Sequence, residues 1–514
     1  MKFRVELTYI ADDGEEVLPI ACLERDEIAL ETLGLTLAEG KTILKAIQQV
    51  MVEKPLSAYV ERQRHCPECG GLRTSKGHHD MTLRTAFGNL TVKSPRLHHC
   101  TCSSAPAKTF SPLAELLPEH TSPELLFLET KWASLVSYGV TAELLKDTLP
   151  IDEKLNDVSI RNHVLEVAER MEQSLGEERP VYIEGCERDW ERLPIPDGPL
   201  TVAIDGGFVR AQGKHGHFEV VTGKSVLAFK RDDPEEAELP DTKCFAFVQA
   251  FDEKPKRRLF ALLKSQGMQE NQQITFLTDG GEDVRNLPLY LNPQAEHLLD
   301  WFHITMRLTV LRQTAKGLAE KTLDGDDQHP LRQPVLDALE SIKWYLWHGN
   351  VFQATKHLDI LEEDLAVAVD ILDDGRTAKM FAAVEEFHAY IDNNRDFIPN
   401  YGERYRHGET ISTAIAESTV NQVISKRMVK RQQMQWSQRG AHLLLQTRTR
   451  VLNDELEKTF RGWYPQFRPE VPRSSPSEAR PGVAVQSVQK VPVTGSNKIN
   501  DLSMLKLYIS NKFK

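Results

Sequence analysis

The apolar and polar positions near the start of the chain follow first the pattern of a strand and then that of a helix. Residues 1–20 alternate between apolar and polar positions, which predicts a β-strand. Residues 26–54 carry apolar side chains at helical spacing, which predicts a helix. The next segment contains two strand-like runs, MTLRTAF and LTVKSPRL, and we expect Gly88-Asn89 to form the hairpin turn between them.

Residues 122–176 have the pattern of at least three short helices. We expect one helix to start at Thr141, after a break at Gly139, and another to begin with Asp157 or Ser159 as its cap. Short helices with tight breaks fit a helix-turn-helix module, and an ordinary helical bundle fits the pattern equally well.

The pattern changes near residue 198. Strand-like runs occur at 200–205, 218–229 and 244–251. They are followed by a helical stretch, a strand at 273–279, a short helix (EDVRNLPLYL) and a last strand-like run, AEHLLDWFHI. This order predicts a mixed sheet with helices on its faces.

Beyond this region the chain is mostly helical. Residues 304–400 contain no strand candidate, and residues 410–460 predict one or two further helices. From 468 onward the sequence is rich in proline and serine, and we expect this tail to be disordered. The expected fold class is therefore a multidomain α/β protein.

Composition and charge narrow the function only slightly. Hydrophobic residues make up 40% of the 514 positions and charged residues 27%, as in globular proteins. We find no apolar run long enough to cross a membrane and no signal-peptide pattern, so we expect a cytosolic protein. The net charge is −12, yet residues 61–110 hold eight Lys/Arg against three Asp/Glu, and residues 401–450 hold nine against three. These local basic segments leave a nucleic-acid partner open.

Two aspartates follow apolar strands in the same sequence context. Asp205 ends LTVAID and Asp279 ends QITFLTD, and each precedes two glycines. Ligands of open α/β sheets gather at the carboxyl ends of strands. Two carboxylates held close together repel each other unless a cation lies between them, so we expect this pair to hold Mg²⁺ or Mn²⁺. A lone Asp-Gly after a strand is more often only a turn.

A third acid, Glu417, lies in a later basic segment. Apolar residues from 411 to 428 recur there at helical spacing. On pattern alone, a solvent-facing glutamate is as good an interpretation as a metal ligand. Glu403 and Glu409 lie close by in the sequence and are alternatives for the same role.

Four of the seven cysteines form two tight pairs, Cys66-x2-Cys69 and Cys100-x-Cys102, on either side of the expected hairpin. In a reducing compartment two such pairs predict one tetrahedral Zn²⁺ site rather than disulfides. The second pair has an unusually short spacing. Five nearby histidines could replace or assist a ligand: His65, His78, His79, His98 and His99. The module is basic, which fits phosphate contacts, and a purely structural role is the alternative.

The phrases VAIDGG, TDGG and DWFHIT, followed by AESTVNQVISKRM, together resemble the DDE transposases, which have an RNase H-like fold. Over residues 60–460 the chain most resembles bacterial insertion-sequence transposases of the Kra type, relatives of the Mutator-like group. The resemblance implies that Asp205, Asp279 and Glu417 are the catalytic metal ligands. It also implies an all-helical insertion between the second aspartate and the glutamate.

The resemblance further implies a D-x-x-H element, which Asp300 and His303 match. An i, i+3 pair shares one helix face, and His303 would touch the scissile phosphate or hold a carboxylate in place. A structural histidine is the alternative. Basic residues after Glu417 would contact phosphates, and Trp436 would stack on an unpaired base or pack in the core. The expected DNA contacts are Lys426, Arg427, Lys430, Arg431 and Trp436.

The patterns and the resemblance together divide the chain into seven parts. These are an N-terminal strand and helix region (1–60), a zinc ribbon-like module (61–110), a helix-turn-helix-like region (120–180), a first part of an RNase H-like core (198–303), a helical insertion (304–405), the last core helices (406–465) and a tail (468–514).

The expected function is metal-dependent cleavage and strand transfer at the terminal inverted repeats of an insertion sequence. The expected partners are double-stranded DNA of the transposon ends and the target, and at least one further copy of this chain, because both ends must be joined together. We expect no membrane partner, and action at the bacterial nucleoid. An RNase H-like nuclease without strand transfer and a domesticated, inactive DNA-binding protein are the alternatives.

Overall fold

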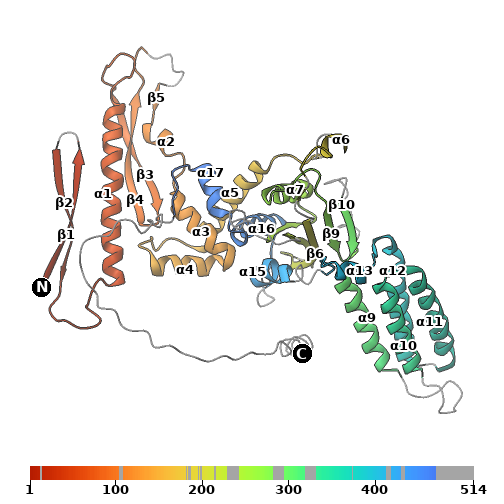
Figure 1. Ribbon diagram of the computed structural model, residues 1–514. Helices are drawn as coiled ribbons and strands as arrows, with labels where there is room; N and C mark the ends of the chain where they lie inside the picture. Colours follow the sequence, from red (N-terminus) through yellow and green to blue (C-terminus); the bar gives the residue numbers. More distant parts are fainter. Residues whose placement is uncertain are drawn as a thin grey trace, which may run out of the picture. The chain divides into compact units, whose positions relative to one another are not determined.

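The structure is a computed structural model, shown in Figure 1. The chain divides into a compact unit, Met1–Phe467, and a second segment, Arg468–Lys514. From residue 470 onward the expected disordered tail lies outside the described residues. The structure describes residues 1–11, 14–102, 108–180, 182, 187–194, 196, 200–213, 216–227, 242–281, 295–318, 331–372, 374–412, 418–429 and 434–469.

The N-terminal region is a two-stranded hairpin followed by one long helix. Strand β1 (Lys2–Ala11) pairs antiparallel with β2 (Gly14–Glu24), and α1 spans Leu37–Gln63. The helix expected over 26–54 is therefore wrong at both ends. It begins at the Thr36 cap because Thr36 and Glu39 form a reciprocal capping box.

The cysteine-containing module is a second antiparallel hairpin. Strand β3 (Ser75–Thr85) pairs with β4 (Gly88–His98), and β5 (Thr109–Phe110) adds a third strand. The turn predicted at Gly88-Asn89 is wrong. Thr85 pairs with Gly88, so the turn residues are Ala86 and Phe87. The Thr85 hydroxyl closes this turn by donating to the Gly88 carbonyl at 2.7 Å, and Gly88 supplies a positive φ of 116° as the strand begins.

Four helices follow, and three of them match the expected pieces of 122–176. The helix expected to start at Thr141 begins earlier, because the Ser137 side chain caps it and Gly139 lies inside it. The cap of the last helix is Asn156, which accepts from the Ser159 N–H, rather than Asp157 or Ser159. The helices are α2 (Pro112–Leu116), α3 (Pro123–Leu135), α4 (Tyr138–Thr148) and α5 (Asp157–Leu175).

A five-stranded mixed sheet forms the centre of the second half, as the sequence predicts. Its order is β10-β9-β6-β7-β8, in which β6, β7 and β8 are antiparallel and β9 and β10 run parallel to β6. The short helix expected in 282–291 lies outside the described residues. The elements here are α6 (Glu187–Trp190), β6 (Leu200–Arg210), β7 (His217–Leu227), β8 (Thr242–Val248), α7 (Pro255–Ser265), β9 (Ile274–Thr278) and β10 (Ala295–Leu299).

Helices cover both faces of this sheet. On one face, α7 packs on Val202, Ile204 and Phe245. On the other face, α16 packs against β8 and also against α3 and α5. Between the two, Leu200–Ile204 of β6 and most of β8 are buried. Helix α16 spans Gln438–Leu452, and α17 spans Leu456–Trp463.

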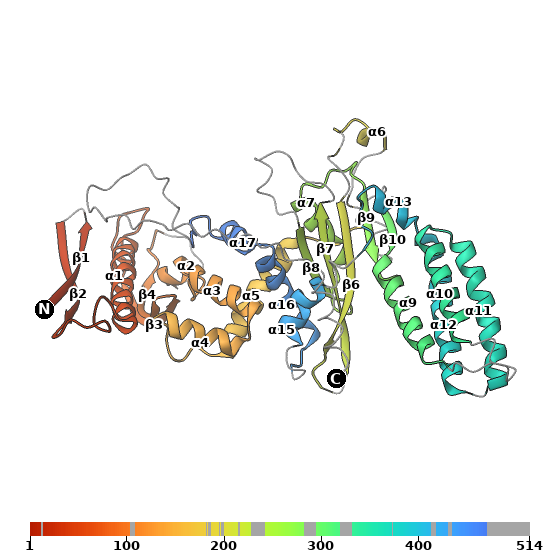
Figure 2. The ribbon, with the colours of Figure 1, turned by 60° about the horizontal axis from the view of Figure 1, so that its bottom comes forward.

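The described residues between 304 and 400 are helical apart from short connections, as their pattern predicts. Helices α9 to α12 pack around one apolar core, and Figure 2 shows them side by side beyond β10. Among the described helices, none combines the length and apolar character needed to cross a bilayer. The bounds are α9 (Trp301–Lys316), α10 (Arg332–Trp347), α11 (Val351–Leu372), α12 (Gly375–Asn393), η3 (Arg395–Phe397) and α13 (Tyr401–Arg406).

Candidate metal centres

Three aspartates lie level with one another on one face of the sheet, on the neighbouring strands β6, β9 and β10 or directly after them. Ala203 pairs with Leu277 on β9, and Leu277 pairs with Leu298 on β10; these three side chains pack together on one face. Side chains alternate between faces along a strand. Two residues further along each strand, the same face therefore presents Asp205, Asp279 and Asp300, here called the aspartate row.

The backbone around the aspartate row holds each carboxylate in place. The Gly206 N–H donates to Asp205 Oδ1 at 2.8 Å, and the Gly281 N–H donates to Asp279 Oδ1 at 3.0 Å. The Asp300 N–H continues the parallel pairing by donating to the Thr278 carbonyl at 2.9 Å. Gly280-Gly281 follow the end of β9, whereas Gly206-Gly207 lie inside β6 and pair with β7, so the strand end expected at Asp205 is wrong.

The helical insertion supports the Asp279 turn directly. The Tyr390 hydroxyl on α12 donates to the Asp279 carbonyl at 2.9 Å. Gly280 has a φ of 90°, and a Cβ there would lie 2.6 Å from Asn394 Oδ1. Only glycine accommodates both the left-handed backbone and this contact. The second aspartate is therefore positioned by a helix that lies 111 residues away along the chain.

Asp300 caps α9 and pairs with His303. Its fully buried carboxylate accepts from the Phe302 N–H at 2.9 Å and from His303 Nδ1 at 2.8 Å. Burial alone would lower the pKa of His303, but the hydrogen bond to Asp300 and the charges of Asp300, Asp205 and Asp279 raise it. The expected D-x-x-H pair thus meets on one turn and lies beside the two aspartates.

The pH dependence of stability follows from this pair. Because the folded-state pKa of His303 is raised, its stabilising contribution is complete below the unfolded pKa of about 6.5 and is lost as pH rises through the folded value. His303→Ala is expected to lower the free energy of unfolding by about 2 kcal/mol at pH 5.5, and by less at pH 9. Denaturant unfolding in EDTA measures both values. A loss that grows with pH would contradict the assigned pair.

Asp205 is the member of the row whose ionisation is disfavoured. Burial raises the pKa of Asp205, and the negative charges of Asp279 and Asp300 add to this effect, while His303 and the Gly206 N–H oppose it. A nearby divalent cation would reverse this balance, because it neutralises the like charges. The oxygen donors and their electrostatics therefore fit a hard cation such as Mg²⁺ or Mn²⁺.

The third expected acid, Glu417, lies outside the described residues, but the helix that follows it is placed. A Cβ on Gly207 would lie 2.7 Å from Ile424 Cδ1 and 3.1 Å from Val420 Cγ1. This helix therefore packs on β6 two residues beyond Asp205. It contains a π-helical turn, Asn421–Ser425, before α15 (Lys426–Met428). Such π-turns are often found at functional sites.

The close contact at Gly207 gives a second prediction. Gly207→Ala is expected to destabilise the fold by about 1–3 kcal/mol, because the fully buried Ile424 side chain has little space to move. The additional change Ile424→Val removes the nearest carbon and should recover part of that loss. Thermal unfolding of the two variants measures the coupling. Gly139→Ala is the matched control, since its Cβ would meet nothing within 4 Å.

The two alternative acids lie on α13 and just after it. Glu403 accepts from the Asn400 side chain at 3.4 Å, and Glu409 pairs with Arg404 at 2.8 Å. Arg404 also pairs with Glu296 on β10. Glu409 is thus already neutralised by a cation, which makes it a weaker candidate ligand than an unpaired acid.

The expected DNA-contacting residues divide into buried, exposed and undescribed positions. Arg427 is 2% exposed, its Nε donates to the Ala133 carbonyl at 2.9 Å, and its guanidinium stacks on Tyr138 and Trp436. Trp436 is 8% exposed, and its indole N–H donates to the Met428 carbonyl at 3.1 Å. Burial of Arg427 does not support its expected phosphate contact, and Trp436 follows the core-packing alternative. Lys426 is exposed, while Lys430 and Arg431 lie outside the described residues.

The four cysteines meet as the spacing predicts, in what we call the four-cysteine cluster. Their sulfur atoms all lie within 4.8 Å of one another, with Cys66 Sγ and Cys102 Sγ 3.5 Å apart and Cys69 Sγ and Cys100 Sγ 3.3 Å apart. A tight turn holds the first pair, because the Gly70 N–H donates to the Cys66 carbonyl at 2.9 Å with a φ of 70° at Gly70. The nearby histidines are not part of this group; His99 instead contacts Phe110.

The four-cysteine cluster has the electrostatics of a metal site. Backbone N–H groups of Cys69 and Glu68 lower the pKa of the Cys66 thiol to about 6. The pKa of Cys102 is raised, because the sulfurs of Cys100, Cys66 and Cys69 crowd it. Four thiols at this distance cannot all ionise without a cation between them. The cluster could therefore hold one metal ion with four sulfur ligands.

A second group of possible ligands was not expected from the sequence. Glu172 on α5, Asp252 after β8 and His442 on α16 also bring ligand atoms within 4.8 Å of one another. Their residues are far apart in the chain, and no motif connects them. The aspartate row is not among the groups of three at this distance in the described part of the chain.

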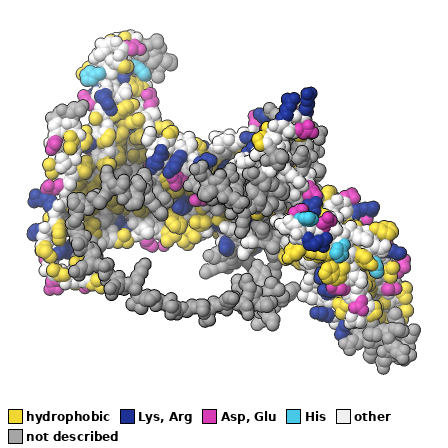
Figure 3. All heavy atoms as spheres, viewed as in Figure 1, with side chains coloured by type: hydrophobic (Ala, Val, Ile, Leu, Met, Phe, Trp, Pro, Cys, Tyr) yellow, Lys and Arg dark blue, Asp and Glu magenta, His cyan; other side chains and the backbone are white. Residues whose placement is uncertain are grey.

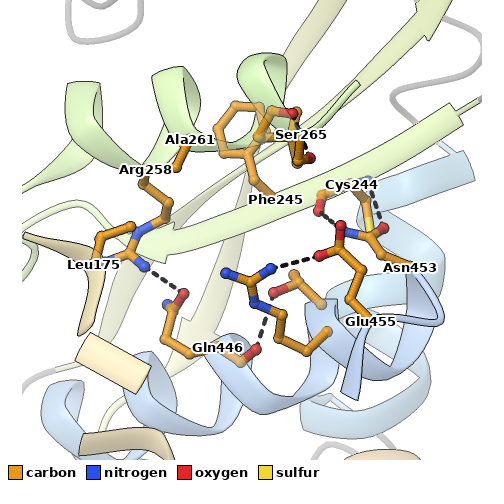
Figure 4. Close-up of a pocket in the computed structure, with 12 residues that line it drawn as sticks. Leu175, Cys244, Phe245, Arg258, Ala261, Ser265, Gln446, Asn453 and Glu455 are labelled. Carbon is orange, nitrogen blue, oxygen red and sulfur yellow. Dashed lines mark hydrogen bonds and ion pairs between the residues drawn. The ribbon is translucent and has the colours of Figure 1, made fainter. Parts of the chain in front are cut away.

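The centre of this second group is already occupied by Arg258. Its guanidinium lies 2.9 Å from Asp252 and 2.9 Å from Glu172, and Figure 4 shows it extending from α7 toward Gln446, to which it donates at 2.6 Å. Burial alone would raise the pKa of Glu172, but hydrogen bonds from His442 and Arg258 lower it to about 2. The donor set therefore does not fit a metal, and the group is a buried ion-pair network that joins α5, α7 and α16.

No protein family matches the sequence, and no curated protein aligns with it significantly.

Proposed function

We propose that this chain is a DDE transposase, which cleaves and joins DNA strands with Asp205, Asp279 and Glu417 as its metal ligands. The observation that carries the proposal is the alignment of Asp205, within β6, and Asp279, directly after the parallel strand β9, on one face of the sheet. The raised pKa of Asp205 supports a cation at this edge. The packing of the helix after Glu417 on Gly207 supports bringing the third acid to the same edge.

The surrounding fold supports the proposal as well. The resemblance implies an RNase H-like mixed sheet and an all-helical insertion between the second aspartate and the glutamate. A mixed sheet is present, and the described residues from 301 to 406 form helices α9 to α13. Tyr390 of α12 and its C-cap residue Asn394 contact the Asp279–Gly280 turn. The insertion would thus act as a support for the second aspartate.

The chain's own groups would divide the chemistry in a simple way. When bound by the carboxylates, paired divalent ions activate water or a 3′-OH and stabilise the charge that develops on the attacking and leaving oxygens. Asp205 and Asp279 would fix the positions of these ions from neighbouring strands. His303, held by Asp300, would present a positive imidazolium edge next to the site, where it can donate to a phosphate oxygen.

The N-terminal modules would recognise the terminal inverted repeats. We assign Zn²⁺ to the four-cysteine cluster, because four thiolates in tetrahedral reach are the ligand set that structural zinc prefers. Helices α3, α4 and α5 pack against one another and would form the helix-turn-helix-like part of the DNA interface. Among the expected DNA contacts after Glu417 that the structure describes, exposed Lys426 is the one suited to a phosphate contact.

The proposal is tested with a supercoiled plasmid that carries the element's own ends. The wild type is expected to nick at these ends in Mg²⁺, and Glu417→Gln is expected to bind the ends without cutting. Glu409→Gln serves as the matched control and should cut normally. If Glu417→Gln cuts as fast as the wild type, Glu417 is the wrong acid, and if neither protein cuts bound DNA, the inactive DNA-binding protein becomes the better interpretation.

A further inference from the structure

The N-terminal hairpin, formed by β1 and β2, leaves much apolar surface exposed. A groove at its base is lined by Phe3, Val5, Leu23, Ile28, Leu33 and Leu35. Ile28 is 79% exposed and Leu33 is 72% exposed, and Figure 3 shows hydrophobic side chains gathered on the surface of this N-terminal part. A two-stranded hairpin is marginally stable by itself in water. An exposed apolar surface of this kind marks an interaction site.

The two outer edges of the hairpin differ in their ability to accept another strand. On β2, Pro19 has no N–H to donate, and a bulge interrupts the pairing where Val5 and Glu6 oppose Ala21 and Pro19. Both features block strand addition. Strand β1 has neither a proline nor an extra residue, and among the described strands it pairs only with β2. The open edge of the hairpin is therefore β1.

The sequence of β1 is complementary to itself in one antiparallel register. If two copies pair about Val5, Arg4 lies opposite Glu6 of the second copy, and Phe3 lies opposite its Leu7. Centring the pairing on Arg4 or on Glu6 instead would place like charges opposite each other. A shift by one residue would move the apolar side chains to the wrong face. Among the registers centred on Arg4, Val5 and Glu6, the charges thus favour the one centred on Val5.

We propose that the β1 edge is a dimerisation site, at which two copies of this chain join their hairpins into one four-stranded antiparallel sheet. The apolar face of that sheet would run continuously across both copies, from Phe3 and Val5 of one to the same residues of the other. Arg4 and Glu6 would form two equivalent ion pairs on the opposite face. The proposal does not depend on the transposase function, because the dimer would form without DNA.

The test is sedimentation of the full chain without DNA across a range of micromolar concentrations. The wild type is expected to sediment as a dimer. Arg4→Glu and Glu6→Arg each place like charges opposite each other at both pairs, so each should raise the dimer dissociation constant at least about tenfold. Glu15→Arg, an exposed change on β2, is the matched control for charge and should leave the dimer intact.

Two rescue experiments separate this pairing from misfolding. The double variant Arg4→Glu/Glu6→Arg restores unlike charges in the same register and should dimerise like the wild type. A mixture of the two single variants should form a heterodimer, because every charged pair is then complementary. A monomeric wild type would overturn the proposal, and so would a dimer that neither single variant weakens, since it would have to form through another surface.

Discussion

Replacing Asp205 or Asp279 with asparagine is expected to lower Mg²⁺-dependent nicking of transposon-end DNA by about 10³-fold. Each change would remove a charged ligand of the proposed metal site, and metal ions stabilise such transition states by several kcal/mol, with each 1.4 kcal/mol worth tenfold in rate. The effect should fall on the cleavage rate rather than on DNA affinity, because in the proposed site both carboxylates hold metal ions rather than contact DNA. Nicking rates with end DNA in excess measure it.

Folding must be excluded as the cause of that loss. Because like charges and burial disfavour ionised Asp205, Asp205→Asn is expected to unfold in EDTA at the same temperature as the wild type or higher. Asp364→Asn, an exposed change on α11, is the matched control and should retain full activity. If Asp205→Asn unfolds at a lower temperature than the wild type, Asp205 stabilises the fold and the loss of activity has a structural cause.

Removing one ligand of the four-cysteine cluster should have the second large effect. Cys66→Ser is expected to abolish the binding of one zinc per chain and to unfold the hairpin of β3 and β4. Structural zinc sites contribute on the order of 10 kcal/mol to such small modules. Cys66 is also the buried member of the cluster. Elemental analysis gives the zinc content, and limited proteolysis reports the state of the module.

Cys22→Ser provides the matched control, since Cys22 is exposed on β2 and far in sequence from the cluster. It should bind the same amount of zinc as the wild type. Chelation of the wild type should reproduce the proteolysis pattern of Cys66→Ser. Unchanged zinc content in Cys66→Ser would show that other groups, such as the nearby histidines, hold the metal.

The apolar runs before Asp205 and Asp279 were the most predictable feature of the candidate site, because a strand buried on both faces gives a continuous apolar run. The predicted strand end was correct only for Asp279, since β6 continues through Gly206-Gly207 to Arg210. The apolar pattern could not predict that Asp205 and Asp279 lie side by side across two strands. This placement depends on the parallel register of β6 with β9, which pairing across the chain decides.

Other features depended on contacts that no local pattern reveals. The helix α1 begins at Leu37 rather than near residue 26, because the capping box of Thr36 and Glu39 fixes its start and the apolar residues before it lie exposed in a loop. Arg427 belongs to a basic run, yet it is buried by stacking on Tyr138 and Trp436. A run of charged residues predicts a charged surface only where their side chains are exposed to solvent.

The ion-pair network around Arg258 was missed for the same reason. Arg258 is 86 residues from Glu172 and 188 from Gln446, so spacing along the chain carries no sign of their contact. Apolar neighbours on α7 do predict a buried helix face. They do not predict that an arginine shares it, because such a residue is buried only when its partners arrive from other elements.

The most direct test of the central claim is a strand-transfer assay with pre-cut transposon ends that already carry a 3′-OH. The account predicts that the wild type joins these ends to a supercoiled target in Mg²⁺, and that Asp279→Asn binds the same ends and joins none. End-binding without joining by the wild type would contradict the transposase assignment. Joining by Asp279→Asn at the wild-type rate would show that the aligned aspartates are not the catalytic site.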